Sequence, residues 1–241
     1  GGDDHKVYLF DKDSSTPLWS YDVGYNVYSV TISADGEYIA AGSQDYKVYL
    51  FDKDSSTPLW SYETGNYVLS VAISADGEHI AAGSKDDKVY LFDKDSSTPL
   101  WSHDTNNIVL SVSISADGEY IVAGTNQFEN DEDEVIFFDK DSSTPLWSYA
   151  TGNDGSFVAI SADGEYIAGS GDKKVYSFRN DPVSRPSVIP YGPRSGSETI
   201  LNTNLRWFPG SDDITNLTFD VYLSWVKSDV LNNNSAALVA D

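Results

Sequence analysis

The chain has 241 residues, of which 40% are hydrophobic and 13% aromatic, and its formal net charge at pH 7 is −23. The apolar fraction suffices for a hydrophobic core and excludes a wholly disordered chain, while such an acidic surface argues against nucleic acid or anionic lipid as a partner. The absence of Cys excludes disulfides, thiolate metal sites and cysteine nucleophiles. No apolar run is long enough to insert in a membrane. Neither a secretory leader nor any Met occurs, so we expect a fragment of a longer protein.

Two motifs recur along the chain at matching intervals. Asp-Lys-Asp-Ser-Ser-Thr-Pro-Leu-Trp-Ser occurs at 11–20, 52–61, 93–102 and 139–148, and Ile-Ser-Ala-Asp-Gly-Glu occurs at 32–37, 73–78, 114–119 and 160–165. Both series have spacings of 41, 41 and 46 residues, and an acidic insertion around 128–134 lengthens the last interval. A period of about 40 residues indicates one supersecondary unit used repeatedly.

One such unit predicts four short strands, at residues 27–33, 38–43, 47–52 and 59–62. The first alternates β-branched residues and ends at an Asp-Gly turn, where glycine accepts a positive φ. The third is a continuous apolar run, typical of a strand buried on both faces. Helical periodicity occurs nowhere. The sequence therefore predicts an all-β fold, a β-propeller of four-stranded antiparallel blades.

The repeats divide into blade units at 1–22 (partial), 23–63, 64–104, 105–150 and 151–179 (partial), within a propeller region at 1–179. These units hold 17 predicted strands, or about four blades. Because most propellers close with more blades, we expect an open arc of a larger ring whose remaining blades are missing from this chain. A closed four-bladed ring is the alternative.

Two stretches carry a family resemblance that covers residues 6–179. Residues 70–84 resemble the first half of a WD repeat, and residues 48–65 are similar to a quinoprotein (pyrroloquinoline-quinone-like) repeat. The Gly-His and Trp-Asp dipeptides of true WD repeats are absent. In the quinoprotein family, a Trp on the outer strand docks against the next blade. The resemblance therefore implies a structural role for Trp19, Trp60, Trp101 and Trp147.

The repeats end near residue 179. Residues 180–197 contain four Pro and are expected to form a linker. Residues 198–241 include two strand-like alternations, at 204–213 and 216–223, which resemble early strands of fibronectin type III-like modules from exported microbial proteins. The resemblance implies a partial module with Trp207 as its core tryptophan.

Catalytic and metal-binding patterns are weak, so we predict no catalytic residue, metal site or cofactor. His79 and His103 replace tyrosines of the other units and are interpreted as packing residues. The Asp11-Lys-Asp13-Ser-Ser15 segments could be calcium loops but lack the required Gly and terminal acidic ligand, so turns are preferred. The acidic stretch 129–134 is likewise interpreted as a solvated loop. The repeated Trp set is interpreted as packing rather than quinone binding.

Comparison of the units with one another predicts two different rims. The turns within the two recurring motifs lie at one end of each blade and do not vary, whereas the connections at the other end differ from unit to unit. Variable loops on a rigid scaffold commonly carry recognition, and drift of duplicated loops is the alternative. The candidate ligand-binding residues on the variable rim are Tyr25, Tyr28, Tyr46, Asn66, Tyr67, Asp86 and Asn107.

We therefore expect a non-enzymatic, extracellular or cell-surface binding scaffold, with a protein or a glycan as ligand. Two alternatives remain open. The chain could be a non-catalytic part of a larger secreted enzyme of the hydrolase or quinoprotein type, or a purely structural surface spacer. The resemblance implies an exported microbial protein of the marine archaeal type, and the acidity and the absence of Cys are compatible with it.

Overall fold

A computed structural model describes residues 2–126, 133–152 and 156–180, together with the backbone of a strand at 189–191. The chain divides into two compact units, Gly1–Glu198 and Thr199–Asp241. The second unit lies outside the described residues, and with it the expected fibronectin-like module and Trp207. Most of the acidic insertion and most of the expected linker are also outside them.

The described residues form strands joined by turns, without a helix. In chain order the strands are β1 (Lys6–Phe10), β2 (Pro17–Asp22), β3 (Val27–Ile32), β4 (Tyr38–Ser43), β5 (Lys47–Asp52), β6 (Trp60–Glu63), β7 (Val68–Ile73), β8 (His79–Ser84), β9 (Lys88–Asp93), β10 (Trp101–Asp104), β11 (Ile108–Ile114), β12 (Tyr120–Asn126), β13 (Asp133–Asp139), β14 (Trp147–Gly152), β15 (Val158–Ile160), β16 (Tyr166–Gly171), β17 (Lys174–Arg179) and β18 (Ile189–Tyr191). The part of the chain that the structure describes contains no helix long and apolar enough to cross a membrane.

The strands pair with their chain neighbours in five antiparallel sheets. The first sheet contains β1 and β2, and the others contain β3–β6, β7–β10, β11–β14 and β15–β18. The sequence predicts 17 strands and none at 189–191, so the prediction lacks β18, which lies within the segment expected as a linker. Its Pro190 pairs opposite Tyr176 at the sheet edge, where a residue without an N–H group is tolerated.

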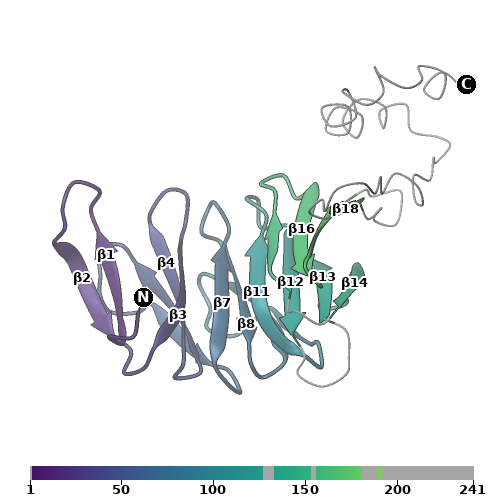
Figure 1. Cartoon of the computed structure of the whole chain (residues 1–241). Coiled ribbons are helices and arrows are strands. Elements are labelled where there is room, and N and C mark those ends of the chain that lie inside the picture. The colour runs from purple at the N-terminus through teal and green to yellow at the C-terminus, as the bar shows by residue number, and fades with distance from the viewer. Residues whose placement is uncertain (1, 127–132, 153–155, 181–188, 192–241) are drawn as a thin grey trace, which may run out of the picture. The chain divides into compact units, whose positions relative to one another are not determined.

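Successive sheets pack face to face, and their first strands lie next to one another. Figure 1 shows β3, β7 and β11 side by side, and close contacts join β3 to β7, β7 to β11 and β11 to β15. This confirms the all-β fold of four-stranded antiparallel blades. Within the described residues the sheets do not close into a ring.

The core consists of apolar layers between neighbouring sheets. One layer joins Ala40, Val48 and Leu50 of the second sheet to Val71 and Phe92 of the third. The next layers repeat this arrangement. The two middle strands of the second, third and fourth sheets are buried along nearly their whole length, which explains their continuous apolar sequences.

Candidate functional site

The two rims predicted from the repeats are present as opposite ends of the sheets. The uniform rim consists of the turns at 33–37 and 53–58 and their copies. Within a sheet these two turns are joined by the Lys53 N–H, which donates to the Glu37 carbonyl at 2.9 Å, and by an ion pair of 2.9 Å between the same side chains. The variable rim consists of the connections at 23–26, 44–46, 64–67, 85–87, 105–107 and 172–173.

The uniform rim also joins each sheet to the next. The Ala34 N–H donates to the Ala75 carbonyl at 3.0 Å, and the two following copies of this bond measure 2.9 Å. The Trp60 Nε1–H donates to the Lys94 carbonyl at 2.7 Å, and its ring centroid lies 5.3 Å from that of Phe92. Trp19 and Trp101 make the same bond, and Trp147 makes the same ring contact with Phe178. The structure thus places all four tryptophans against the following sheet.

The two histidines in tyrosine positions also pack between sheets. His79 lies against the turn glycine Gly118 of the next sheet, in the place that Tyr38 takes against Gly77. His103 packs edge to face on Phe138 with ring centroids 5.1 Å apart, and Tyr62 packs on Phe92 in the same way in the preceding copy.

The Asp-Lys-Asp-Ser-Ser segments form turns in which the first carboxylate accepts a hydrogen bond from a backbone N–H of the same turn. Asp52 Oδ1 accepts the Asp54 N–H at 2.8 Å, and Ser55 Oγ accepts the Thr57 N–H at 3.0 Å. Lys53 Nζ lies within 3.1 Å of Asp54 as well as of Glu37, and these contacts raise the pKa of Lys53, with the Glu37 hydrogen bond as the largest cause. Among the described residues, no group of three or more His, Asp or Glu is arranged to hold a metal ion.

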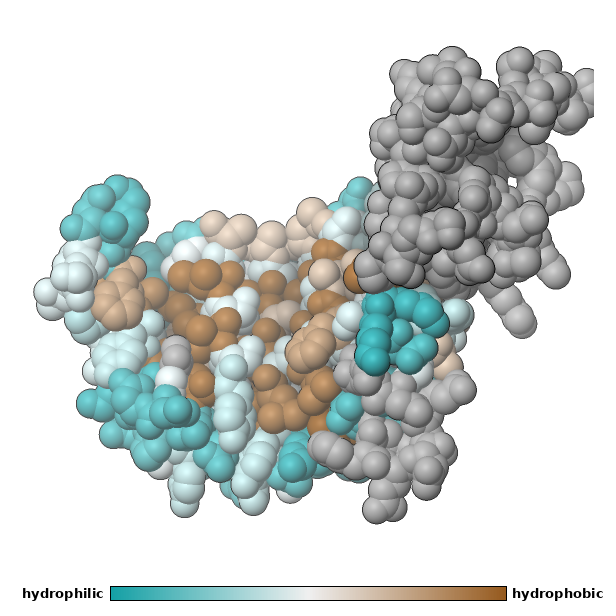
Figure 2. Space-filling model, viewed as in Figure 1, coloured by the Kyte–Doolittle hydropathy of each residue, from teal (hydrophilic) through white to brown (hydrophobic). Residues whose placement is uncertain are grey.

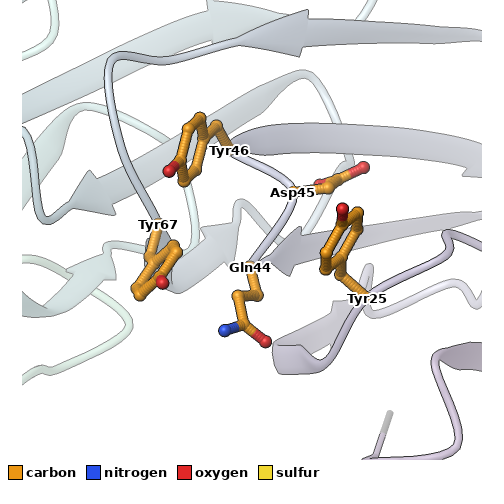
Figure 3. Close-up of a pocket in the computed structure, with 5 residues that line it drawn as sticks. All are labelled: Tyr25, Gln44, Asp45, Tyr46 and Tyr67. Atoms are coloured by element: carbon orange, nitrogen blue, oxygen red, sulfur yellow. The ribbon is translucent and has the colours of Figure 1, made fainter.

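On the variable rim a hollow of about 240 Å³ opens between the second and third sheets. Three tyrosines predicted as ligand-binding residues line it, Tyr25, Tyr46 and Tyr67, together with Gln44 and Asp45. In Figure 3 the Gln44 side chain lies between the rings of Tyr25 and Tyr67. We call these five residues the tyrosine hollow.

Tyr67 is the centre of a cluster of rings. Its centroid lies 5.5 Å from that of Tyr46 and 6.0 Å from that of Tyr28, with both pairs tilted. Lys85 Nζ lies 5.7 Å from the Tyr67 centroid, over the ring face. Aromatic pairs and cations over ring faces are each favourable, so these contacts hold Tyr67 in place at the side of the hollow.

Backbone hydrogen bonds fix the three connections that carry the hollow. The Gln44 N–H donates to the Asn26 carbonyl at 2.9 Å, the Thr64 N–H to the Tyr46 carbonyl at 2.7 Å, and the Lys85 N–H to the Tyr67 carbonyl at 2.8 Å. Each bond joins one connection to the next. The side chains of the hollow are therefore presented on a cross-linked backbone, which reduces the ordering cost of binding.

The Asp45 carboxylate is bonded within the fold and is not free to bind a ligand. It accepts hydrogen bonds from the Lys47 N–H at 3.1 Å and from the Tyr49 hydroxyl. Burial, followed by this hydrogen bond, raises the pKa of Tyr49. Asp86 repeats the arrangement with Tyr90 at 2.6 Å, so this aspartate belongs to the repeat itself.

Tyr46 occupies a backbone conformation that side chains of its size rarely adopt. Its φ is 72°, and the equivalent residues His5, Asp87 and Lys173 also have positive φ. A left-handed conformation costs a non-glycine residue about 1–2 kcal/mol, and such strain concentrates at functional sites. The turn imposes the conformation, but nothing in the repeat requires an aromatic ring there.

The remaining predicted ligand-binding residues have internal partners or are buried. Asn66 Oδ1 accepts the Tyr67 N–H at 2.8 Å, and Asp86 Oδ2 accepts the Gly65 N–H at 2.6 Å. Asn107 is buried, and its Oδ1 has no hydrogen-bond partner among the described residues. The structure thus gathers the tyrosines of the prediction at one place and leaves Asn66, Asp86 and Asn107 outside the hollow.

Sequence reasoning did not select Gln44, Asp45 or Lys85. Gln44 and Asp45 belong to the connection of Tyr46, and Lys85 belongs to that of Asp86, so a selection of whole connections would have included them. Which of their side chains reach the hollow depends on the packing of two sheets.

Two family models match parts of the chain. The outer membrane protein assembly factor BamB model matches residues 68–181, and the WD domain, G-beta repeat model matches residues 16–52. These matches confirm the two repeat types named from the sequence. Comparison with curated proteins gave no match.

A solved structure shares the fold. It is hydrazine synthase of Kuenenia stuttgartiensis, with a TM-score of 0.63 and 17% sequence identity, and the similarity covers 77% of this chain and 60% of that one. At this identity the similarity shows the fold alone. The chain is therefore built from β-propeller repeats similar to WD repeats and to the quinoprotein-like repeats of BamB.

Proposed function

We propose that this β-propeller domain is a non-enzymatic interaction scaffold that binds a partner protein at the tyrosine hollow. The observation that carries the proposal is the gathering of aromatic residues at one junction. Four tyrosines from four different repeat positions take part. Tyr25, Tyr46 and Tyr67 line the hollow, and the Tyr28 ring contacts that of Tyr67.

The internal copies supply the comparison, because they show what the fold itself requires. The position of Tyr25 is Asn in the next two units, that of Tyr28 is Leu in both, that of Tyr46 is Asp in the next, and that of Tyr67 is Asn or Ile. The fold forms with each of these residues. The fold therefore does not require tyrosine at these four positions.

The chemistry of the hollow suits contact rather than bond making. Tyrosine offers a large rigid face and a hydroxyl at low entropic cost, and it is enriched where proteins bind one another. The hollow volume of about 240 Å³ matches one large side chain of a partner, the kind of anchor that dominates many interfaces.

A glycan is the second candidate ligand. The Gln44 amide lies between two tyrosine rings, and an amide can both donate and accept hydrogen bonds, as the hydroxyls of a sugar require. The partner protein is preferred because propeller repeats of this kind typically serve as interaction scaffolds.

We further propose that the domain acts outside the cytoplasm. The match to an outer membrane protein assembly factor over residues 68–181 supports this location, and so does the complete absence of Cys from a 241-residue chain. The domain could equally serve as a non-catalytic part of a larger exported enzyme.

The test is selection of binders from a peptide display library and from a glycan array, with the chain immobilised. We expect binders that Tyr25→Ala and Tyr67→Ala weaken at least about tenfold, as loss of an aromatic anchor does. The control is Phe157→Ala, because Phe157 is an exposed aromatic residue, as Tyr25 is, and does not line the hollow. Peptide binders unaffected by the hollow variants would refute the proposed site, and hollow-dependent binding of glycans alone would favour the second candidate.

A further inference from the structure

The first sheet differs from the others in holding only two strands. β1 and β2 have the sequences of the third and fourth strands of the repeat, as in β5 and β6. In the complete sheets the third strand pairs with the second, so Gly42 lies opposite Val48. The corresponding edge of β1, which includes Val7, has no partner strand among the described residues.

The second sheet exposes apolar residues toward this gap. Val30 of β3 is 46% exposed, whereas its copies Val71 and Val112 are each 6% exposed. Ile32 is 51% exposed, while its copy Ile73 packs against the layer between two sheets. Figure 2 shows hydrophobic residues gathered over β3, β7 and β11, and Figure 1 gives the same view of these strands.

Backbone groups are left open at the same place. In the later junctions a serine of one first strand accepts an N–H of the next, as Ser29 Oγ accepts the Val71 N–H at 3.1 Å and Ser70 Oγ the Val112 N–H at 3.0 Å. Val30 has the same register as Val71, and the described residues supply no such serine for its N–H. The Ala34 carbonyl likewise lacks the donor that the Ala75 carbonyl has in Ala34 N–H.

The glycines of the equivalent turns show that one aromatic neighbour is absent at the second sheet. A Cβ at Gly77 would lie 2.5 Å from Tyr38 of the preceding sheet, and one at Gly118 would lie 2.7 Å from His79. A Cβ at Gly36 would meet nothing within 4 Å. Each later turn glycine thus seats an aromatic residue of the preceding sheet, and the seat at Gly36 is open.

We propose that this surface binds a two-stranded β-hairpin from a further copy of the same repeat. The surface consists of the free edge of β1 with Val30, Ile32, Ala34 and Gly36, and we call it the hairpin acceptor. Its continuity with the three later junctions defines the occupant, because each of those junctions shows the matching hairpin in place.

The occupant needs four features at fixed spacing. Its first strand carries a serine that accepts the Val30 N–H, and its turn carries an alanine whose N–H donates to the Ala34 carbonyl. Its second strand starts with an aromatic residue for the Gly36 seat and has a glycine as its next-to-last residue, as β8 does. Glycine is required because a Cβ at Gly83 would lie 2.6 Å from Val109 Cγ1 of the next sheet, and Val27 is the matching residue of the second sheet. Residues 68–84 of this chain have all of these features.

The experiment adds a fluorescent synthetic peptide of residues 68–84 to the full chain and follows anisotropy. We expect saturable binding that is weakened at least about tenfold by Val30→Asp, because the charge would be buried without a partner. Gly36→Ala should weaken binding by closing the aromatic seat. The matched control Leu59→Asp changes an apolar residue of similar exposure just before the outer strand β6 and should bind like the parent. Tyr67→Ala should also bind like the parent, and it tests the tyrosine hollow separately.

Peptide variants test the same geometry from the other side. The peptide with Gly83→Val should fail to bind, and that with Ser70→Ala should bind more weakly. A second measurement joins residues 68–84 directly to Asp3, which places the hairpin before Asp4 as in the copy before Asp86. This fusion should melt several degrees higher than the parent, and Gly83→Val within it should remove the gain. Binding insensitive to Val30→Asp, or a fusion that melts no higher, would overturn the proposal.

Discussion

The uniform and variable rims are made by the same strands, yet they use their residues differently. On the uniform rim, backbone groups of the turns bond within the fold, as in the bonds from Lys53 to Glu37 and from Ala34 to Ala75. On the variable rim, the backbone is equally fixed, but the side chains of Tyr25, Gln44 and Tyr46 remain open to the hollow. Residues common to all the repeats therefore build the framework, and a binding site can form where the residues differ from repeat to repeat.

The largest effect is expected from breaking the uniform rim at Trp60. Trp60→Ala removes both the ring packed on Phe92 and the bond to the Lys94 carbonyl, so it should destabilise the fold by about 3 kcal/mol. Urea denaturation provides the measurement. Leu59→Ala, at the exposed neighbouring position, should stay within about 0.5 kcal/mol of the parent. Equal losses for the two variants would show that the Trp60 contacts do not stabilise the packing of one sheet on the next.

A pair of glycines separates backbone strain from packing. Gly36 and Gly77 have φ of 77° and 76°, so alanine at either position should cost about 1–2 kcal/mol for the left-handed conformation. Gly77→Ala should cost at least about 1 kcal/mol more, because its Cβ would meet the Tyr38 ring. Thermal melting of the two variants measures the difference. Equal costs for the two variants would show that the contact between Tyr38 and the turn at Gly77 does not contribute to stability.

Acid should weaken the turns of the uniform rim. Hydrogen bonds from Ser33 and Ser161 are the largest cause that lowers the pKa of Asp35 and Asp163 below the ordinary 3.8. A carboxylate with a lowered pKa stabilises the folded state above its unfolded pKa, and this stability is lost as the pH falls through the folded value. Melting temperatures should therefore fall below about pH 4, and less so in the Asp35→Asn, Asp163→Asn variant. A parallel fall in parent and variant would contradict this source of acid sensitivity.

The smallest effect is expected within the hollow itself. Tyr46→Asn relieves the left-handed strain at φ 72°, since Asn adopts this conformation more readily, and this gain of about 1 kcal/mol offsets the lost ring contact with Tyr67. The melting temperature should stay close to that of the parent, while binding to the selected partner weakens. A large loss of stability would show that Tyr46 is a packing residue.

The repeated unit could be predicted from the residues alone. Strands such as Tyr38–Ser43 and Lys47–Asp52 are predicted at their observed bounds. The prediction uses the period, the invariant turns and the continuous apolar third strand. These features are visible in the sequence because turns need particular residues and a strand buried on both faces needs apolar ones. The same comparison of copies selected three of the five residues that line the hollow.

The contacts between non-equivalent repeat positions could not be predicted from the residues, because they depend on how the sheets pack. Tyr25 and Tyr46 belong to the second sheet's connections and Tyr67 to the next, and their meeting depends on the offset between sheets, which no single repeat encodes. The same packing drew Asp86 into internal bonds and buried Asn107, although both stand in variable connections. It also supplied β18 from a segment without the repeat motif, because an unpaired sheet edge selects backbone hydrogen bonds rather than a particular sequence.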